Sequence, residues 1–505
     1  MMMRLVLGCA FALAAGLGLA GCAGGEGARR STPPVERATR PARPAEMRPR
    51  PRARKPPLRP VAARSVAARR VAARRVTIPP DLFTRKPAGP PKSGLKTVNA
   101  LGEAKLKKHT AGANAFAWAL YDRLRRKKGN VFFSPFSVSS ALAMVRAGAA
   151  GRTLRQMAKV MRIKLPEGAV HRGFNQHLVT VNDADGGSST VRVANSLWGQ
   201  QGVTFGAKFL KRTRRYYDAR LSVVDFHGNP SGAAHAINLW CAKQTNNLIR
   251  RVVNRHSFSV DTRLVLVNAI YFQSDWKSTF DKSDTASKPF YLDHRRRRHV
   301  KVDTMYQLMK IGYYKKGRLR VGVIPYLDKS YSMVVLTYRG RLSRLETRLR
   351  TRGALDKLVK KATPRMIEVY LPKFELTLSY GLVKPLSKMG MRDLFTKRAN
   401  LKPTAPGRNL FVSEVRHRAY VKVDEEGTVA AAVTAVSEDE NGDDSHPVLR
   451  ADMPFLFFIR HNPTGLILFA GRVANPTPQA KAIRRRPRRG VRPRPRPRHH
   501  VDEDS

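Results

Sequence analysis

The feature that most constrains the fold is a nearly continuous apolar run at Leu264–Phe272, rich in Val and Ile. A run of this length and β-branched content is typical of a strand that is buried on both faces. Met333–Leu336, Glu368–Leu371 and Leu456–Ile459 are further strand candidates. The chain must therefore build large sheets with other structure packed against them.

Two helical patterns precede these strands. Asn114–Leu124 has apolar residues at helical spacing and ends before a turn at residues 127–130. Ser137–Arg146 is a second, largely apolar helix candidate, with Gly148 near its end. Helices dominate the first part of this region and strands the later part, so the sequence predicts an α+β fold.

Basic tracts rich in Pro and Arg flank the region that carries these patterns. Residues 23–90 include a repeated Val-Ala-Ala-Arg-Arg unit, and residues 481–498 are mostly Arg and Pro. Such compositions do not bury enough apolar surface to fold. The repeat could instead form a basic helix on an anionic surface, although a solvated spacer is the favoured interpretation. We predict a signal peptide at 1–21, a disordered spacer at 22–90, one domain at 91–476 and a disordered tail at 477–505.

The first residues resemble a bacterial lipoprotein signal peptide. Arg4 precedes an apolar stretch that ends in Leu19-Ala20-Gly21-Cys22, which is similar to a lipobox. The resemblance implies cleavage before Cys22, acylation of that residue and anchoring in the bacterial envelope at the outer membrane, on either its periplasmic or its outward side. A transmembrane helix is the alternative, because no charge interrupts residues 5–23. The glycines and the Cys favour cleavage.

The charge balance favours anionic partners. The chain carries 96 Lys and Arg against 36 Asp and Glu, a formal net charge of +60 at pH 7. This predicts attraction to nucleic acid, acidic polysaccharide or anionic lipid. Arg295–Arg298 could bind phosphate or sulfate, although a solvated hairpin turn is the favoured interpretation. A polyanion such as a glycan or nucleic acid is a candidate modulator, and no other cofactor is expected.

Cysteine usage excludes two classes of site. Cys241 is the only thiol after the first segment, so neither a disulfide framework nor a Cys-based zinc site can form in the domain. The sequence predicts that Cys241 is a small buried apolar residue rather than a nucleophile. No metal site is expected.

Motifs along most of the domain resemble those of serpins. In chain order they are Asn130–Ser137 with Ala141–Met144, Asn268–Phe272 with Trp276 and Phe280, Leu371–Phe374, Met389–Phe395, Val423–Thr428, Pro454–Phe457 and Phe469–Val473. The resemblance implies a helical N-terminal half, a large central β-sheet with further sheets, and an exposed reactive loop. It also implies a monomer that inhibits serine or cysteine proteases and is not an enzyme.

Four polar residues could suggest a hydrolase: Ser134, Ser137, Asn195 and His417. The sequence lacks the G-x-S-x-G elbow and an Asp in a matching motif. The serpin resemblance instead places the four in the shutter, a polar cluster beneath the central sheet where its strands separate. The resemblance also assigns Trp276 to the breach, at the top of that sheet.

The segment from Gly427 to about Pro447 carries the predicted function. The resemblance implies a reactive-loop hinge made of Glu425, Glu426, Gly427, Thr428, Ala430, Ala431 and Ala432. Gly427 suits a hinge because glycine tolerates backbone angles that other residues resist. Residues 428–436 are uncharged and mostly small, and alternate residues from Thr428 would point inward if the segment became a strand. In the implied mechanism a protease cleaves the loop, which then inserts into the sheet and traps the acyl-enzyme. An Ala-rich linker is the alternative.

The scissile bond is predicted within Glu440, Asn441, Gly442 and Asp443. The family's spacing from Gly427 favours cleavage after Asn441, whereas counting back from the C-terminal strands favours Asp443. Asn441-Gly442 also has the composition of a tight turn. We expect a target protease that cuts after Glu, Asp or Asn.

Glu438 and Glu440 depart from the pattern, because an inserted strand would bury both carboxylates. Either insertion stops early, or both residues reach solvent at the far end of the sheet. A second hypothesis, which rests on the basic charge of the domain, is a non-inhibitory serpin that acts as a basic, polyanion-binding scaffold of the envelope.

Overall fold

The computed structural model describes residues 94–182, 189–428 and 446–477. The chain divides into two units, residues 1–77 and 78–505, and every described residue lies in the second. The predicted signal peptide with Cys22, the spacer and the tail beyond Thr477 lie outside the described residues. Within the described ranges, no helix is long and apolar enough to cross a membrane.

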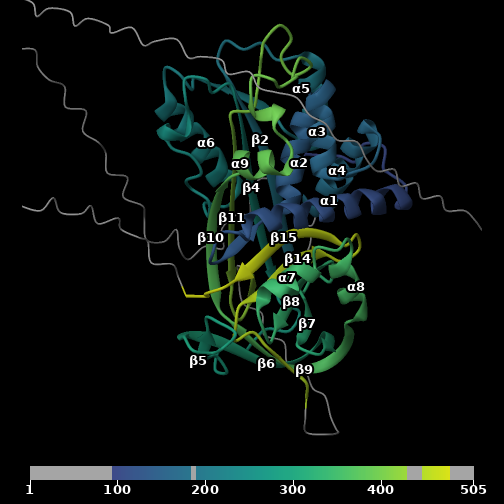
Figure 1. Ribbon diagram of the computed structural model, residues 1–505, viewed down its shortest axis with the longest axis vertical. Helices are drawn as coiled ribbons and strands as arrows, with labels where there is room; N and C mark the ends of the chain where they lie inside the picture. The colour runs from purple at the N-terminus through teal and green to yellow at the C-terminus, as the bar shows by residue number, and fades with distance from the viewer. Residues whose placement is uncertain (1–93, 183–188, 429–445, 478–505) are drawn as a thin grey trace, which may run out of the picture. The chain divides into compact units, whose positions relative to one another are not determined.

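Most of the helices precede or flank the long strands (Figure 1). They are α1 (Glu103–Leu124), α2 (Pro135–Arg146), α3 (Gly151–Met161), α4 (Glu167–Asn182), α5 (Ala207–Tyr217), α6 (Pro230–Gln244), α7 (Leu342–Arg348), α8 (Ala354–Lys361) and α9 (Val383–Met389). Both predicted helices are confirmed. α1 begins earlier than predicted, because its first turns carry exposed lysines in place of a repeating apolar face.

The strands extend all four predicted segments. They are β1 (Val131–Phe133), β2 (Ser189–Gln200), β3 (Leu221–Val224), β4 (Leu264–Asp275), β5 (Ala286–Tyr291), β6 (His299–Lys316), β7 (Leu319–Pro325), β8 (Tyr331–Tyr338), β9 (Thr363–Pro372), β10 (Phe374–Gly381), β11 (Glu414–Val423), β12 (Gly427–Thr428), β13 (Val448–Arg450), β14 (Phe455–His461) and β15 (Leu466–Val473).

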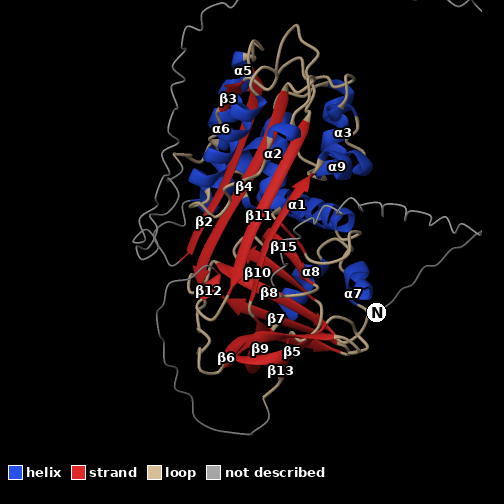
Figure 2. Cartoon of the chain, turned by 90° about the vertical axis from the view of Figure 1, so that its left-hand side faces the viewer, coloured by secondary structure: helices blue, strands red, loops and turns tan. Residues whose placement is uncertain are grey.

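Two sheets contain these strands. One has the order β1-β15-β14-β8-β7-β6-β9-β13, with β5 paired to β6. The other has the order β10-β11-β12-β4-β2-β3, with β11 also paired directly to β4. Figure 2 shows the long strands of this second sheet, called here the central sheet, side by side with α2 packed against them. The α+β prediction is confirmed.

Strand β4 explains why its sequence is continuously apolar. Every residue of Leu264–Phe272 is buried. Leu264, Leu266, Ile270 and Phe272 pack into the main core, whereas Val265, Val267 and Ala269 pack into a second cluster with α6. Successive side chains of a strand point to opposite faces, and here both faces are covered. Cys241 lies in the second cluster, where burial raises the pKa of its thiol to about 12, as expected of an unreactive core residue.

Helix α2 begins where the sequence signals a helix start. The Ser134 hydroxyl caps it by accepting a hydrogen bond from the Ser137 amide at 3.2 Å, and Pro135 occupies the first turn. All 12 residues of the helix are buried, between α1 on one side and β2, β4 and β15 on the other. This burial fixes the start of α2 directly beneath the central sheet.

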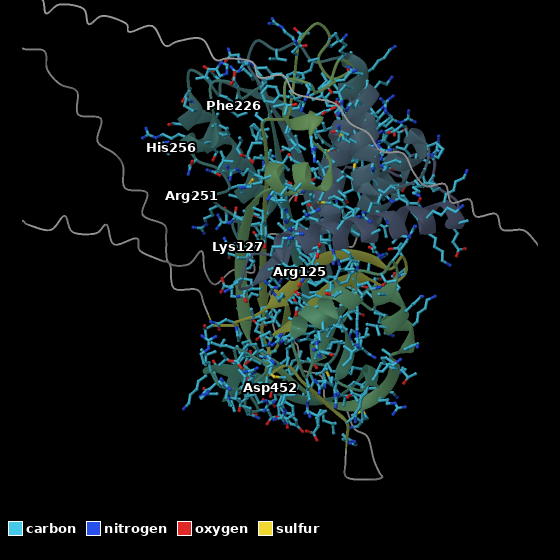
Figure 3. All side chains as sticks on the ribbon, viewed as in Figure 1. Arg125, Lys127, Phe226, Arg251, His256 and Asp452 are labelled. Atoms are coloured by element: carbon cyan, nitrogen blue, oxygen red, sulfur yellow. The ribbon has the colours of Figure 1, made fainter. Side chains whose placement is uncertain are left out.

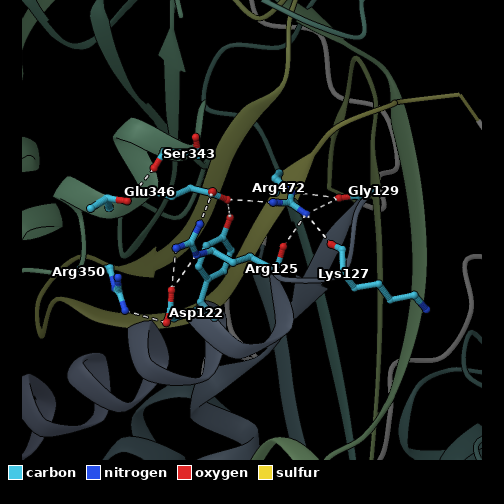
Figure 4. A network of polar contacts seen from close by, with 10 residues as sticks. Asp122, Arg125, Lys127, Gly129, Ser343, Glu346, Arg350 and Arg472 are labelled. Atoms are coloured by element: carbon cyan, nitrogen blue, oxygen red, sulfur yellow. Dashed lines mark hydrogen bonds and ion pairs between the residues drawn. The ribbon is translucent and has the colours of Figure 1, made fainter. Parts of the chain in front are cut away.

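A buried carboxylate ties α7 to α1 and β15 (Figure 4). Glu346, whose side chain is 3% exposed, accepts hydrogen bonds from Tyr121 at 2.6 Å, Arg125 at 3.0 Å and Arg472 at 3.1 Å. Arg472 also donates to the carbonyl of Gly129 at 2.8 Å. The negative charge is thus fully paired, which is the condition for burying it without a large cost.

The four arginines at 295–298 lie in the exposed turn between β5 and β6, which confirms the predicted hairpin turn. Arg296 pairs with Asp452 at 2.8 Å and lies over the ring of Tyr291 at 4.5 Å. Asp452 is labelled at the lower end of Figure 3, whereas Arg251 and His256 project from the opposite half.

Candidate functional site at the hinge and shutter

The central sheet is open at one end, between β4 and β11. The two strands pair in parallel from Val265 with Glu414 to Ile270 with Ala419. Beyond this point they separate, and β12 lies between them, antiparallel to both. Because Gly427 pairs with Asp275 and Thr428 with Ser274, a strand continued past Thr428 would run along β4 toward the directly paired segment.

Thr428 points into the protein. Thr428 is 1% exposed, and its hydroxyl lies 2.8 Å from the hydroxyl of Tyr326, which is fully buried. Burial raises the pKa of Tyr326, so the phenol remains protonated and can donate this hydrogen bond. The first residue that the predicted loop would insert is therefore already seated in the sheet.

The structure gives Gly427 a steric role in addition to the predicted conformational freedom. Its backbone lies outside the left-handed region in this state. A Cβ atom at this position would lie 2.3 Å from the carbonyl oxygen of Ser274 and 2.7 Å from the Cα of Asp275. Only glycine lets the hinge approach β4 this closely.

Trp276 holds the turn that leads into β12. Its indole Nε1 donates to the carbonyl of Asp424 at 3.0 Å, and its amide donates to the carbonyl of Glu426 at 2.9 Å. The ring is 1% exposed and stacks on Tyr326 with centroids 4.7 Å apart. Trp276 and Thr428 therefore share Tyr326 as a neighbour.

Ion pairs fix the two hinge glutamates. Glu425 accepts hydrogen bonds from Lys373 and Thr285, each at 2.8 Å. Burial by itself would raise the pKa of Glu425, but these hydrogen bonds outweigh burial and lower it. Glu426 pairs with the exposed Lys282 at 2.6 Å. The turn before β12 is therefore anchored by charge on both of its carboxylates.

The four predicted shutter residues lie together around Asn268 of β4. His417 places Nδ1 2.6 Å from the Asn268 side-chain oxygen, and its Nε2 accepts a hydrogen bond from the Ser134 amide at 3.0 Å. The Asn268 amide nitrogen donates to both Ser137 and Asn195. One amide side chain thus connects β2, β4, β11 and the first turn of α2.

The contacts of His417 fix its protonation. Nδ1 must carry the proton, because its partner is an oxygen, and Nε2 must be unprotonated to accept from an amide. Burial lowers the pKa of His417 to about 3, consistent with a neutral ring. The Ser134 hydroxyl donates to the Leu468 carbonyl at 2.6 Å rather than to the ring. The hydroxyl–imidazole hydrogen bond of an activated nucleophile is therefore not made between these two residues.

Sequence reasoning did not assign a site role to Asn268, Tyr326 or Lys373. Asn268 did carry a signal, since it is a polar amide inside the apolar run Leu264–Phe272. Tyr326 and Lys373 contact hinge residues that lie far from them in the sequence, so no local sequence pattern indicates these contacts.

Several predicted residues lie outside the described residues: Ala430, Ala431, Ala432, Glu440, Asn441, Gly442 and Asp443. Across the ranges that the structure describes, no group of His, Cys, Asp and Glu is arranged to hold a metal ion.

Comparisons with known proteins agree on one family. The family model described as Serpin (serine protease inhibitor) matches residues 111–476. An uncharacterized serpin-like protein of Thermococcus kodakarensis is 36% identical over 386 residues, covering 75% of this chain and 88% of the relative. Leukocyte elastase inhibitor of Bos taurus is 38% identical over 361 residues, covering 69% of this chain and 93% of the relative.

Solved structures show the same similarity. Human glycosylated kallistatin is 31% identical with a TM-score of 0.66, covering 74% of this chain and 99% of that one. Uncleaved ovalbumin is 27% identical with a TM-score of 0.66, covering 73% and 100%. With a family match over most of its length and relatives above 30% identity, the chain belongs to the serpin family of serine protease inhibitors.

Proposed function

We propose that this serpin is a suicide inhibitor of serine or cysteine proteases, cleaved near Asn441 and trapped by insertion of its loop between β4 and β11. The observation that carries the proposal is β12, which already occupies the gap between these strands in the register that an inserting strand needs. The similarity to leukocyte elastase inhibitors supports protease inhibition.

The composition of the loop suits continued insertion. From the buried Thr428, alternate residues Ala430, Ala432, Thr434 and Val436 would face the interior, and all of them are small. Each inserted residue would exchange backbone hydrogen bonds to water for bonds to β4 and β11. The uninserted state is then held by a kinetic barrier rather than by its free energy.

The proposed target cuts after Glu, Asp or Asn. The candidate bond lies within Glu438-Asp439-Glu440-Asn441-Gly442-Asp443-Asp444, which offers no Lys or Arg to a trypsin-like protease. Glu438 and Glu440 fall on the inward face of an inserted strand, so insertion is proposed to end with both carboxylates near solvent at the far end of the sheet.

A lipid anchor at Cys22 and attraction to polyanions complete the proposal. Exposed cations such as those at 295–298 favour contact with phosphate or sulfate groups. Phosphate contacts release counterions, so binding to heparin or DNA should weaken steeply as salt rises. If the chain binds polyanions but never traps a protease, the second hypothesis, a non-inhibitory envelope scaffold, replaces the first.

The deciding experiment incubates the purified chain with a glutamate-specific and an asparagine-specific endopeptidase. We expect a covalent complex that survives detergent and heat, and a cleaved form whose melting temperature exceeds that of the native form. Cleavage near Asn441 without a complex and without a rise in melting temperature would overturn the proposal.

A further inference from the structure

The end of the molecule opposite the hinge carries many cations and few acidic residues. Two segments meet there, residues 203–217, which include α5, and residues 394–413, which lead into β11. The Gly206 amide joins them by donating to the Thr404 carbonyl at 2.9 Å. Neither segment contains Asp or Glu, whereas together they contain nine Lys and Arg, called here the basic end. These are Lys208, Lys211, Arg212, Arg214, Arg215, Lys397, Arg398, Lys402 and Arg408.

The charges of the basic end are exposed and almost entirely unpaired. All nine side chains face solvent. Arg398 lies 4.0 Å from Asp393, and the other eight make no ion pair with a carboxylate of the described residues. On α5, four of the cations are spaced three or four residues apart and share one face: Lys208, Lys211, Arg212 and Arg215. Like charges at this spacing destabilise a helix, and an anionic partner would relieve their repulsion.

Strand β4 separates the basic end from the hinge. At the start of β4 the Ser413 amide donates to the Leu264 carbonyl at 3.0 Å, and at its other end Asp275 pairs with Gly427. A strand of 12 residues is about 40 Å long. Figure 2 shows the same separation, with α5 at the upper end of the molecule and β12 far below it. A partner bound at the basic end therefore leaves the hinge uncovered.

The arginine turn at 295–298 is the other concentrated group of cations, and its charge is partly neutralised. Arg296 pairs with Asp452 at 2.8 Å, and Arg298 lies 3.9 Å from Asp293. The basic end has more cations and only one such neighbour, so it offers the stronger positive field.

We propose that the basic end binds an anionic membrane surface and so turns the hinge away from the lipid. Cations spread over two segments at one end of the molecule suit a broad array of phosphate groups better than a single narrow chain. Each cation near an anionic bilayer strengthens binding about fivefold. The attraction fades within a Debye length of about 8 Å, so an end about 40 Å away contributes little. This binding requires neither protease trapping nor an anchor at Cys22.

The test reads the orientation of the domain on a vesicle, because other cations of the chain would also attract it to anionic lipid. The full chain carries Cys9→Ser and Cys22→Ser, so that a fluorescent thiol label attaches only at an introduced cysteine, since Cys241 is buried. One protein is labelled at Ala207→Cys, at the start of α5, and another at Ser287→Cys, in β5 at the hinge end.

The vesicles contain phosphatidylglycerol and a lipid with a nitroxide on its headgroup, which quenches only labels close to the surface. We expect quenching at position 207 and little at position 287. Vesicles of phosphatidylcholine with the same nitroxide lipid should quench neither label. Raising the salt concentration should remove the quenching at position 207.

Two variants with the same loss of charge locate the contact. The first neutralises four cations of the basic end, which should weaken docking more than about 100-fold and abolish quenching at position 207. It carries Lys211→Gln, Arg215→Gln, Lys402→Gln and Arg408→Gln. The matched control neutralises four exposed lysines of α1 and α8 and should keep the quenching. It carries Lys105→Gln, Lys107→Gln, Lys357→Gln and Lys360→Gln.

Equal quenching at positions 207 and 287, or quenching at position 207 that the first variant retains, would overturn the proposal. Binding of heparin that falls in the first variant, without quenching by phosphatidylglycerol vesicles, would also overturn it. That result would leave the attraction to polyanions proposed above in place and would assign the basic end to a soluble polyanion.

Discussion

Replacing Thr428 by arginine tests whether the seated hinge is the start of an inserting strand. Thr428 is 1% exposed, and its hydroxyl contacts that of Tyr326 at 2.8 Å. An arginine in this place would bury an unpaired charge, which costs several kcal/mol, and would lose a hydrogen bond of about 1 kcal/mol. A total of about 4–6 kcal/mol lowers the equilibrium constant for placing residue 428 in the sheet by a factor of roughly 10³–10⁴.

This penalty should convert an inhibitor into a substrate. The scissile region is unchanged in Thr428→Arg, so a protease that cuts near Asn441 should still cleave it. If insertion begins at Thr428, its rate falls by a comparable factor, and the acyl-enzyme hydrolyses before the trap closes. The stoichiometry of inhibition, titrated with a glutamate-specific or asparagine-specific endopeptidase, should rise steeply, and gels should show cleaved product in place of the covalent complex.

The matched control is Val429→Arg. Alternation along a strand sends this neighbouring side chain to the opposite face, so the same charge should remain near solvent and the stoichiometry should stay close to that of the wild type. A Thr428→Arg variant that traps protease as efficiently as the wild type would refute the argument, because insertion would then not pass through this position.

Four further predictions concern stability and targeting. Asn268→Ala should destabilise the fold by about 3 kcal/mol or more in urea unfolding, because it leaves partners in Ser137, Asn195 and His417 unsatisfied; an unchanged midpoint would contradict this. Burial lowers the pKa to about 3 in His171 and His417 and to about 4 in His109 and His461. These neutral histidines therefore contribute their full share to the free energy of unfolding above about pH 6.5, and this free energy should fall as the pH is lowered toward 4, by up to about 1.4 kcal/mol per pH unit for each histidine. A melting temperature that stays constant between pH 7 and pH 5 would disprove this. Glu346→Ala should cost about 3 kcal/mol by leaving Arg125 and Arg472 without their shared carboxylate, whereas Glu103→Ala, at an exposed helix start, should cost little. Cys22→Ala should abolish acylation, and an unchanged amount of protein in the lipid-modified membrane fraction would rule out the proposed anchor.

The sequence predicted the structure best where the burial of each residue is visible in its own side chain. The apolar run at 264–272 predicted a strand covered on both faces because each of its residues is covered on its own side. The start of α1 escaped prediction, since its exposed lysines leave no periodic signal. The steric requirement for glycine at position 427 could not be predicted, because its close approach to Ser274 depends on how two distant segments pair. The same limit applies to Tyr326, whose meeting with Thr428 no local spacing encodes.

The shutter lies directly in the path of the proposed insertion. Asn268 and His417 face each other in the parallel pairing of β4 and β11, and their side chains are 2.6 Å apart. Neighbouring strands are about 4.8 Å apart, so a strand inserted at this level would move β4 and β11 to about twice that separation. The Asn268–His417 hydrogen bond cannot survive such a movement, and both buried groups must then find partners on the inserted strand. The network that stabilises the uninserted sheet is therefore also part of the barrier to insertion. It follows that Asn268→Ala should lower the melting temperature of the native form more than that of the cleaved form, in which the bond is already broken. Equal losses in the two forms would show that the bond survives insertion and that the strand stops short of the shutter.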